Sequence, residues 1–194
     1  DSFTYNLYQY MGIFEKDIKV VRNDKITIEE IEQLNPNRIV LSPGPKSPKE
    51  AGICIDVVKH FYQKKPILGI CLGLQLFFES SEETPGVEGL GLLPGKIVRI
   101  PDKEGFKIPH MGWNSISIQP ESRLLRGIPE GSYVYFVHSY YLKAENPSDV
   151  AATADYIVDF HAAVEHENIF ATQFHPEKSG EIGLQILRNF VTMK

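Results

Sequence analysis

The sequence predicts an α/β domain of three layers, in which helices cover both faces of a mostly parallel sheet and an antiparallel section follows in the second half. Strand-like and helical segments alternate up to about Glu83. The strands expected at residues 38–41 and 66–70 are apolar almost throughout, as in parallel strands that are buried on both faces. After Glu83 the pattern changes to short strands separated by turns. These three features indicate a flavodoxin-like outline.

The first elements are predicted from spacing and from capping residues. An amphipathic helix runs up to Met11, and we expect Gly12 to end it in a left-handed conformation. Residues 17–21 have the composition of a strand. Thr27 and Glu30 then have the Thr-x-x-Glu spacing of a capping box, which predicts that a helix begins there.

The next elements establish the alternation on which the fold class depends. A strand over residues 38–41 is halted by Ser42-Pro-Gly-Pro45, and a helix is expected over residues 53–62. Residues 66–70 form the next strand, and a helical run covers residues 74–79. The antiparallel section is predicted from four further strands and is followed by a closing amphipathic helix. The strands are Lys96–Ile100, Ser115–Ile118, Tyr133–Tyr141 and Ala151–Ala154, and the helix is Glu181–Met193.

Length and composition favour one domain over residues 1–194. The chain has 194 residues, of which 42% are hydrophobic, and this is enough for one sizeable core. A formal charge of −5 with no basic cluster argues against a nucleic-acid partner. The absence of a long apolar run and of a secretion signal, together with only two cysteines, predicts a reduced, cytoplasmic protein. The chain begins with a helix, whereas a domain of this kind usually begins with a strand, so a truncated start is one of the alternatives.

The segment Gly69-Ile-Cys-Leu-Gly73 has the pattern of a nucleophile elbow. Cys71 lies between two glycines, directly after an apolar strand and before a helical run. Such a sharp strand-to-helix turn exposes the nucleophile above the sheet, and glycines give it room. The start of the following helix favours the thiolate. The alternative is a buried cysteine on a glycine-rich turn.

A second segment, Thr172-Gln-Phe-His-Pro-Glu177, supplies a histidine and a carboxylate two residues apart. A carboxylate that orients an imidazole lets it take a thiol proton and later donate a proton to a leaving amine. Taken alone, His-Pro-Glu is also compatible with a simple turn. Both segments in one alternating chain favour cysteine-based catalysis by Cys71, His175 and Glu177.

Three segments together resemble the signature blocks of the class I, or triad, glutamine amidotransferases. These are Pro43-Gly-Pro45, Gly69-Ile-Cys-Leu-Gly73 and Gln173-Phe-His-Pro-Glu177. The resemblance implies that Cys71 attacks the carboxamide of glutamine, that His175 acts as base and then acid, and that Glu177 orients the imidazole. It implies an oxyanion hole formed by Gly44, Pro45, Lys46 and Leu72. It also implies a glutamine site formed by Gln75, Ser139 and Tyr140.

Lys46 departs from the family pattern, because relatives carry glycine at the last position of this loop. A residue with a side chain resists positive φ, which raises the cost of turning a backbone amide toward the oxyanion. We therefore expect the loop to be poised differently from that of its relatives.

The two parts of the chain resemble different members of the family, so the sequence reads as a chimera. Residues 1–70 resemble the glutaminase component of anthranilate or aminodeoxychorismate synthase, through Asp1–Asn6, Val21–Asp24 and Leu41–Pro45. Residues 71–194 resemble the glutaminase subunit of imidazole glycerol phosphate synthase, an enzyme of histidine biosynthesis. The marks of the second likeness are Leu76–Glu79, Gly89–Leu92, Pro109–Asn114, Tyr135–His138 and Glu177–Ser179.

The second likeness is the more specific one and implies a partner. The partner is a (β/α)₈ cyclase subunit that consumes the ammonia, and the runner-up is a chorismate-using synthase subunit. The residues implied to face the cyclase are Pro109, His110, Met111, Gly112, Trp113, Asn114, Tyr135 and Lys178. Without the resemblance, Trp113 also fits a core position.

No cofactor and no metal are expected. His110 and His138 lack further ligands at metal spacing, so they are assigned structural or interface roles. Two rivals to a glutaminase remain open. One is another cysteine hydrolase on this fold, such as a peptidase or γ-glutamyl hydrolase, and the other is an inactive hybrid or interaction protein.

Overall fold

The computed structural model describes residues 3–44, 52–83, 85–86 and 89–193. The helices are α1 (Thr4–Met11), α2 (Ile28–Leu34), α3 (Cys54–Phe61), α4 (Leu72–Gln75) and α5 (Gly180–Thr192), with 3-10 turns η2 (Pro147–Asp149) and η3 (Pro176–Lys178). The strands are β1 (Ile39–Leu41), β2 (Ile67–Ile70), β3 (Ser80–Ser81), β4 (Gly95–Arg99), β5 (His110–Ser115), β6 (Ser117–Ile118), β7 (Tyr133–His138), β8 (Tyr140–Ala144), β9 (Val150–Tyr156), β10 (Val158–His166) and β11 (Ile169–Thr172).

The main sheet has the order β1-β2-β11-β10-β8-β4-β3, and off this path β9 pairs with β10 and β6 pairs with β9. Parallel pairing joins β1 to β2, β2 to β11, and β3 to β4. The pairs that involve β8, β9 and β10 are antiparallel, as expected for the second half of the chain. β5 and β7 form a separate antiparallel pair, which we call the β5–β7 ribbon.

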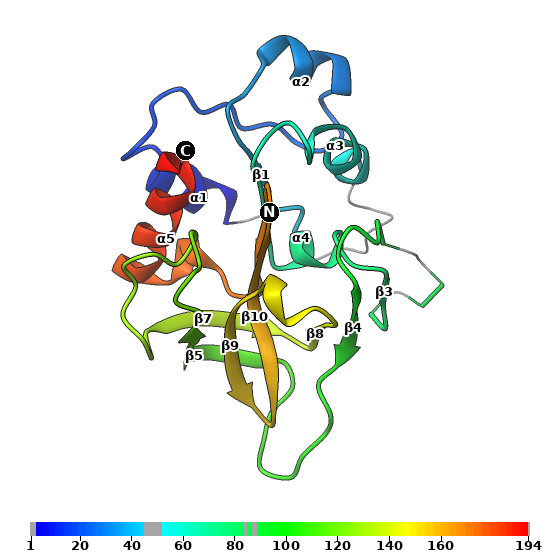
Figure 1. Ribbon diagram of the computed structural model, residues 1–194, viewed down its shortest axis with the longest axis vertical. Coiled ribbons are helices and arrows are strands. Elements are labelled where there is room, and N and C mark those ends of the chain that lie inside the picture. The colour runs from blue at the N-terminus through cyan, green and yellow to red at the C-terminus, as the bar shows by residue number, and fades with distance from the viewer. Residues whose placement is uncertain (1–2, 45–51, 84, 87–88, 194) are drawn as a thin grey trace.

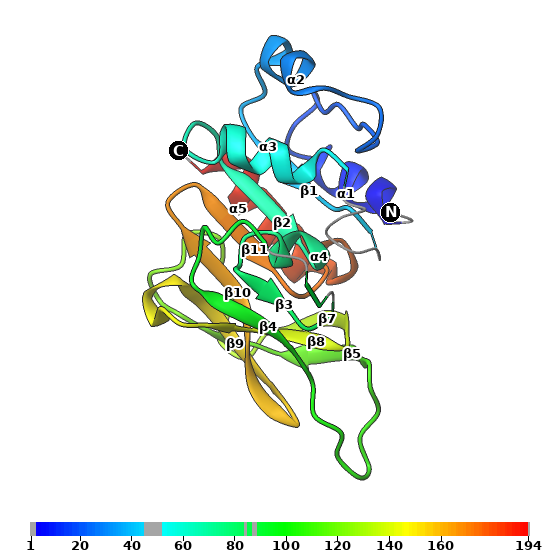
Figure 2. The ribbon, with the colours of Figure 1, turned by 90° about the vertical axis from the view of Figure 1, so that its right-hand side faces the viewer.

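Helices cover both faces of the parallel strands. Successive strand residues point to opposite faces of the sheet, so each face contributes its own residues to a separate core. On one side, Leu68 and Phe170 belong to a core shared with α1 and α5. On the other side, Ile67 and Ala171 belong to a core shared with α3 and α4. Figure 1 shows these strands nearly edge-on between the two helix pairs, and Figure 2 shows α2 and the β4–β5 loop at opposite ends of the molecule. The predicted α/β class is confirmed.

Local signals located several elements correctly. The capping box is present, since the Thr27 hydroxyl accepts from the Glu30 N–H at 3.2 Å and the Glu30 carboxylate accepts from the Thr27 N–H at 2.8 Å. The strands at residues 38–41 and 66–70 and the closing helix lie within a residue or two of their predicted bounds.

Three local predictions are wrong. The helical run expected over residues 74–79 is instead the short helix α4, Leu72–Gln75, and residues 76–79 are not helical. Residues 17–21 form no strand within the described part of the chain, and Val20 is 51% exposed. Gly12 ends α1 with φ −62°, so it is not left-handed. A glycine fits here for a steric reason instead, because a Cβ would lie 2.9 Å from the Tyr8 carbonyl oxygen.

Candidate active site

The carboxyl ends of β1, β2 and β11 meet at one edge of the sheet, and the predicted site residues follow these ends. Leu41 ends β1 and leads to Gly44, Ile70 ends β2 and leads to Cys71, and Thr172 ends β11 and leads to His175. Parallel neighbours place such loops side by side, and this edge is where open α/β sheets bind their ligands.

Cys71 occupies a strained turn between β2 and α4. Its φ is 55° and its ψ is −105°, and its N–H donates to the Thr172 carbonyl at 2.8 Å, which joins the turn to β11. Positive φ in a residue with a side chain costs energy that the surrounding contacts must offset, and such strain is concentrated at functional sites. The predicted elbow therefore exists.

The glycines on either side of Cys71 are required by close backbone approach. A Cβ at Gly69 would lie 2.6 Å from the Gly73 carbonyl oxygen. A Cβ at Gly73 would lie 2.7 Å from the Leu41 carbonyl oxygen of β1. Both distances are too short for any real side chain, so the Gly-x-Cys-x-Gly pattern is what lets the turn fit against β1.

His175 and Glu177 form a buried pair beside the elbow. The Nδ1 atom of His175 lies 2.7 Å from the Oε1 atom of Glu177, and the residues are only 5% and 2% exposed. A carboxylate can only accept, so Nδ1 carries the proton and Nε2 of the neutral ring is the basic nitrogen. That Nε2 is buried and makes no hydrogen bond of normal geometry to any described residue.

The charge state of His175 is set by its two partners. Burial lowers the pKa of His175, but the nearby Cys71 and then Glu177 oppose this effect and raise the pKa to about 9. An imidazolium beside the Glu177 carboxylate and Cys71 is therefore stabilised at neutral pH, which suits a group that holds the proton of the thiol.

Three further residues predicted for the oxyanion hole and the glutamine site follow the ends of β1 and β2. Leu72 begins α4 directly after Cys71, and Gly44 has φ 82° in the loop after β1. The Gln75 amide is buried, donates to Glu83 and accepts from the Ser81 hydroxyl at 3.1 Å. Pro45 and Lys46 lie outside the described residues, so the expected effect of Lys46 on the loop stays a prediction.

Ser139 and Tyr140 lie at the junction of β7 and β8. The Ser139 carbonyl accepts from the Ile100 N–H at 2.9 Å, and the Tyr140 carbonyl is 2.8 Å from Nδ1 of His138. Backbone contacts thus anchor both residues, whose assignment to glutamine binding stays a prediction.

The residues predicted to face a partner divide between the two sides of the β5–β7 ribbon. Trp113 lies opposite Tyr135, and directly opposed residues share a face. Met111 and Trp113 are 63% and 55% exposed on this outer face, so a core position for Trp113 is wrong. His110 is 3% exposed and lies on the inner face with Gly112 and Asn114, whose side-chain amide donates to the Asp155 carbonyl at 2.7 Å.

Lys178 lies between two aromatic rings next to the site. Its Nζ atom is 3.4 Å from the ring centre of Phe3 and 4.9 Å from that of Tyr135. Such cation–π contacts tie the residue after Glu177 to the ribbon. Pro109, which precedes the ribbon, follows Ile108 through a cis peptide bond.

Three residues that touch the site were not predicted from the sequence. The Phe3 ring packs against that of His175 with centroids 6.0 Å apart, and the Gln173 amide lies 3.9 Å from the Cys71 sulfur. The Ser179 hydroxyl donates to the His175 carbonyl at 2.7 Å and accepts from the Tyr135 N–H at 3.0 Å. Gln173 and Ser179 stand beside recognised residues in the sequence, but only the fold brings Phe3 to them.

A family profile described as glutamine amidotransferase class-I matches residues 1–193. The chain belongs to the class I glutamine amidotransferases. The solved structure of a putative GMP synthase protein from Thermoplasma acidophilum is similar to this amidotransferase with a TM-score of 0.69 and 26% identity, over 97% of this chain and 86% of that one. A glutamine amidotransferase from Thermotoga maritima shares the fold alone, with a TM-score of 0.54 and 16% identity over 82% of this chain and 74% of that one.

Similar curated proteins carry the name imidazole glycerol phosphate synthase subunit HisH. The protein from Methanothermobacter thermautotrophicus is 53% identical over 148 residues, which cover 76% of this amidotransferase and 73% of the relative. The protein from Geobacillus sp. is 41% identical over 199 aligned residues, which cover 97% and 92%. The predicted function, a glutaminase subunit of this synthase, is thereby confirmed.

The same relatives do not support the predicted chimera. The Geobacillus protein aligns over 97% of this amidotransferase, so most of residues 1–70 match a HisH protein as well.

The described side chains include no group of three or more His, Cys, Asp or Glu suited to a metal ion. Among the helices that the structure describes, none combines the length and the apolar character needed to cross a membrane.

Proposed function

We propose that this class I glutamine amidotransferase hydrolyses L-glutamine through Cys71, His175 and Glu177 and passes the ammonia to a cyclase subunit. One observation carries the catalytic assignment. A cysteine with φ 55° stands at the end of β2, beside a buried His175–Glu177 pair at the end of the neighbouring strand β11. This arrangement contains a nucleophile, a base and a group that orients the base.

In the first half-reaction, the proton of Cys71 is held on Nε2 of His175 and the sulfur attacks the carboxamide carbon of glutamine. The tetrahedral intermediate collapses as the C–N bond breaks, and His175 returns the proton to the leaving nitrogen. Ammonia leaves, and a glutamyl thioester stays on Cys71. Glu177 keeps the imidazole in the tautomer that has a free Nε2 and stabilises its cation.

In the second half-reaction, water attacks the thioester carbon while His175 takes a proton from it. The C–S bond breaks, glutamate leaves, and Cys71 and His175 return to their starting states. In both steps a negative charge develops on the former carbonyl oxygen. We assign its stabilisation to the backbone N–H of Leu72 and to the loop of Gly44, Pro45 and Lys46. Gln75, Ser139 and Tyr140 are assigned to binding the glutamine.

The proposed partner is a (β/α)₈ cyclase subunit, which the outer face of the β5–β7 ribbon and Lys178 would contact. The exposed Met111 and Trp113 support this, since large exposed apolar and aromatic side chains are typical interface anchors. We further propose that residues 1–194 act as one catalytic domain in the cytoplasm, where the synthase supplies histidine biosynthesis.

The deciding experiment measures glutaminase activity of the purified chain, first alone and then with a cyclase subunit plus its nucleotide ligand. A chorismate-using subunit serves as a parallel arm. We expect stimulation by the cyclase only. Stimulation by the chorismate-using subunit would reverse the partner assignment, and no activity in any arm would refute the proposal.

The nucleophile is tested with Cys71→Ala and with Cys54→Ala as the matched control. Cys54 is a buried thiol in α3, and burial raises its pKa to about 11, so it is not reactive at neutral pH. Glutamine-dependent turnover should vanish in Cys71→Ala and persist in Cys54→Ala, while ammonia-dependent synthesis by the cyclase persists in both. Glutaminase activity retained by Cys71→Ala would refute the assignment.

A further inference from the structure

Two buried histidines that the proposed chemistry does not use face each other across the β5–β7 ribbon. His110 and His138 are directly opposed in the ladder, and they are 3% and 7% exposed. Nδ1 of His110 lies 2.9 Å from Nε2 of His138. The His110 ring is stacked between two aromatic rings, with centroid distances of 4.0 Å to Tyr156 and 4.9 Å to Phe136.

The contacts of this His110–His138 pair determine where its protons lie. Nδ1 of His138 is 2.8 Å from the Tyr140 carbonyl oxygen, which can only accept, so Nδ1 donates. A neutral His138 then has an acceptor at Nε2, and Nδ1 of His110 must donate to it. The result is a directed chain of two hydrogen bonds from His110 through His138 to the Tyr140 carbonyl.

Both rings are neutral in this arrangement. Burial lowers the pKa of His110 to about 4 and the pKa of His138 to about 3, and the nearby His110 and His175 also lower the pKa of His138. A second proton on His138 would replace the acceptor at Nε2 by a donor that faces the donor of His110. The chain of hydrogen bonds therefore depends on neutral rings.

The pair connects two parts of the proposed machinery. His110 lies on β5, whose neighbouring residues Met111 and Trp113 are exposed on the outer face of the ribbon. His138 ends β7 and bonds to Tyr140, which begins β8 in the main sheet. The hydrogen bonds thus cross from the exposed strand to the turn at which the chain leaves the ribbon.

We propose that His110 and His138 are positioning residues that hold the Ser139–Tyr140 backbone in its glutamine-binding conformation and tie it to the strand facing the partner. The inference rests on the proposed function, in which Ser139 and Tyr140 bind glutamine. Without the His138 bond, the Tyr140 carbonyl lacks its side-chain donor and the turn gains conformational freedom that glutamine binding must then remove.

The test compares three variants in the complex with the cyclase subunit. His138→Leu removes both hydrogen bonds and should raise the KM for glutamine about tenfold, with a smaller effect on kcat, because binding geometry rather than the triad is altered. His138→Gln should stay within about threefold of wild type, because a carboxamide supplies one donor and one acceptor and does not titrate. His110→Phe keeps the ring stack, removes one donor and should raise the KM about threefold.

His161→Leu is the matched control. Nδ1 of His161 accepts from the Ala144 N–H at 2.9 Å, so this variant also removes a histidine bond to the β8 backbone, but at the end of β8 away from Tyr140. Its KM for glutamine should be unchanged. Thermal unfolding of each variant establishes that the protein is folded, and if His138→Leu does not fold, His110→Phe decides.

The inference is overturned if folded His138→Leu has the KM of wild type, or if His138→Gln is impaired as strongly as His138→Leu. In the fallback, an unchanged KM in His110→Phe overturns it. Failure of the proposed function looks different, because the wild-type complex would then show no glutaminase activity, or Cys71→Ala would retain it.

Discussion

A single hydrogen bond decides which nitrogen of His175 is basic. The Glu177 carboxylate fixes the proton on Nδ1 at 2.7 Å and, together with Cys71, counters the effect of burial on the pKa. In Glu177→Gln the side-chain amide can donate to Nδ1, which favours the tautomer with the proton on Nε2. That tautomer cannot take the thiol proton.

We therefore expect Glu177→Gln to lower glutaminase kcat by roughly 10³-fold with a small change in KM for glutamine. The pKa of His175 should fall from about 9, because an amide does not stabilise the cation. Steady-state kinetics and histidine NMR titration measure the two effects. Glu181→Gln, an exposed neighbour in α5, is the control, and equal kinetics in the two variants would refute the role of Glu177.

At the same scale, the triad could be predicted from sequence because its signals are local. The glycines around Cys71 are dictated by distances to Gly73 and Leu41, and the two-residue spacing of His175 and Glu177 is read directly. The contact of Phe3 with His175 spans almost the whole chain and has no local signal. No residue pattern can indicate such a contact before the fold is known.

At the scale of elements, the β5–β7 ribbon makes the stability of the folded protein fall at acidic pH. Both of its buried histidines have pKa values below the unfolded value of 6.5, at about 4 and about 3. A histidine with a lowered pKa in the folded state contributes stability that is fully present above pH 6.5 and is lost as the pH falls toward its folded pKa.

The free energy of unfolding should thus fall between pH 7 and pH 5 by up to about 2 kcal/mol per histidine of the pair. Urea unfolding of wild type and of His110→Phe/His138→Gln measures it, and the double variant should show a shallower decline. His175 acts oppositely, since its pKa of about 9 gives stability that is complete below pH 6.5 and lost as the pH rises through 9. Parallel declines in the two proteins would contradict the assignment.

Elements were predictable where periodicity and flanking residues agree. β2 and α5 follow their apolar patterns, while β5 was missed because it buries the polar His110 and exposes Met111 and Trp113. The strand expected over residues 17–21 shows the converse. Its apolar residues suit a strand, but a strand also requires a paired neighbour, and the described residues provide none there.

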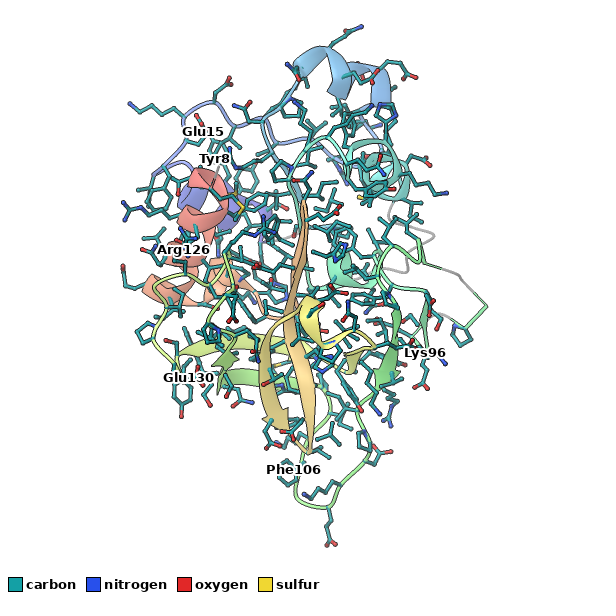
Figure 3. All side chains as sticks on the ribbon, viewed as in Figure 1. Tyr8, Glu15, Lys96, Phe106, Arg126 and Glu130 are labelled. Atoms are coloured by element: carbon teal, nitrogen blue, oxygen red, sulfur yellow. The ribbon has the colours of Figure 1, made fainter. Side chains whose placement is uncertain are left out.

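At the scale of the whole molecule, the β5–β7 ribbon lies far from α2, which Figure 1 shows at the other end of the molecule. Figure 3 labels Phe106 beyond the ribbon, in the loop between β4 and β5, where its ring contacts Tyr156 with centroids 5.6 Å apart. Tyr156 stacks in turn on His110. This end of the molecule therefore combines the proposed docking face with the pair that we propose to anchor the glutamine site.

We expect Trp113→Ala to weaken association with the cyclase by about 2 kcal/mol or more, since a central aromatic is a typical hot spot. Leu34→Ala is the control, because Leu34 is 47% exposed on α2 at the other end of the molecule. Calorimetric titration with the cyclase measures both affinities. Similar affinities for the two variants would show that the partner binds elsewhere.

The alternating directions of the side chains along β5 also have a consequence for evolution. Successive residues of β5 face two different environments, so Met111 and Trp113 on the proposed docking face can vary together with a partner's surface while His110 is constrained by the protein's own interior. Under the proposed function, selection for a new partner and selection for glutamine turnover act on interleaved positions of one strand. A lineage could exchange its partner at this ribbon without disturbing the turn that lies behind it.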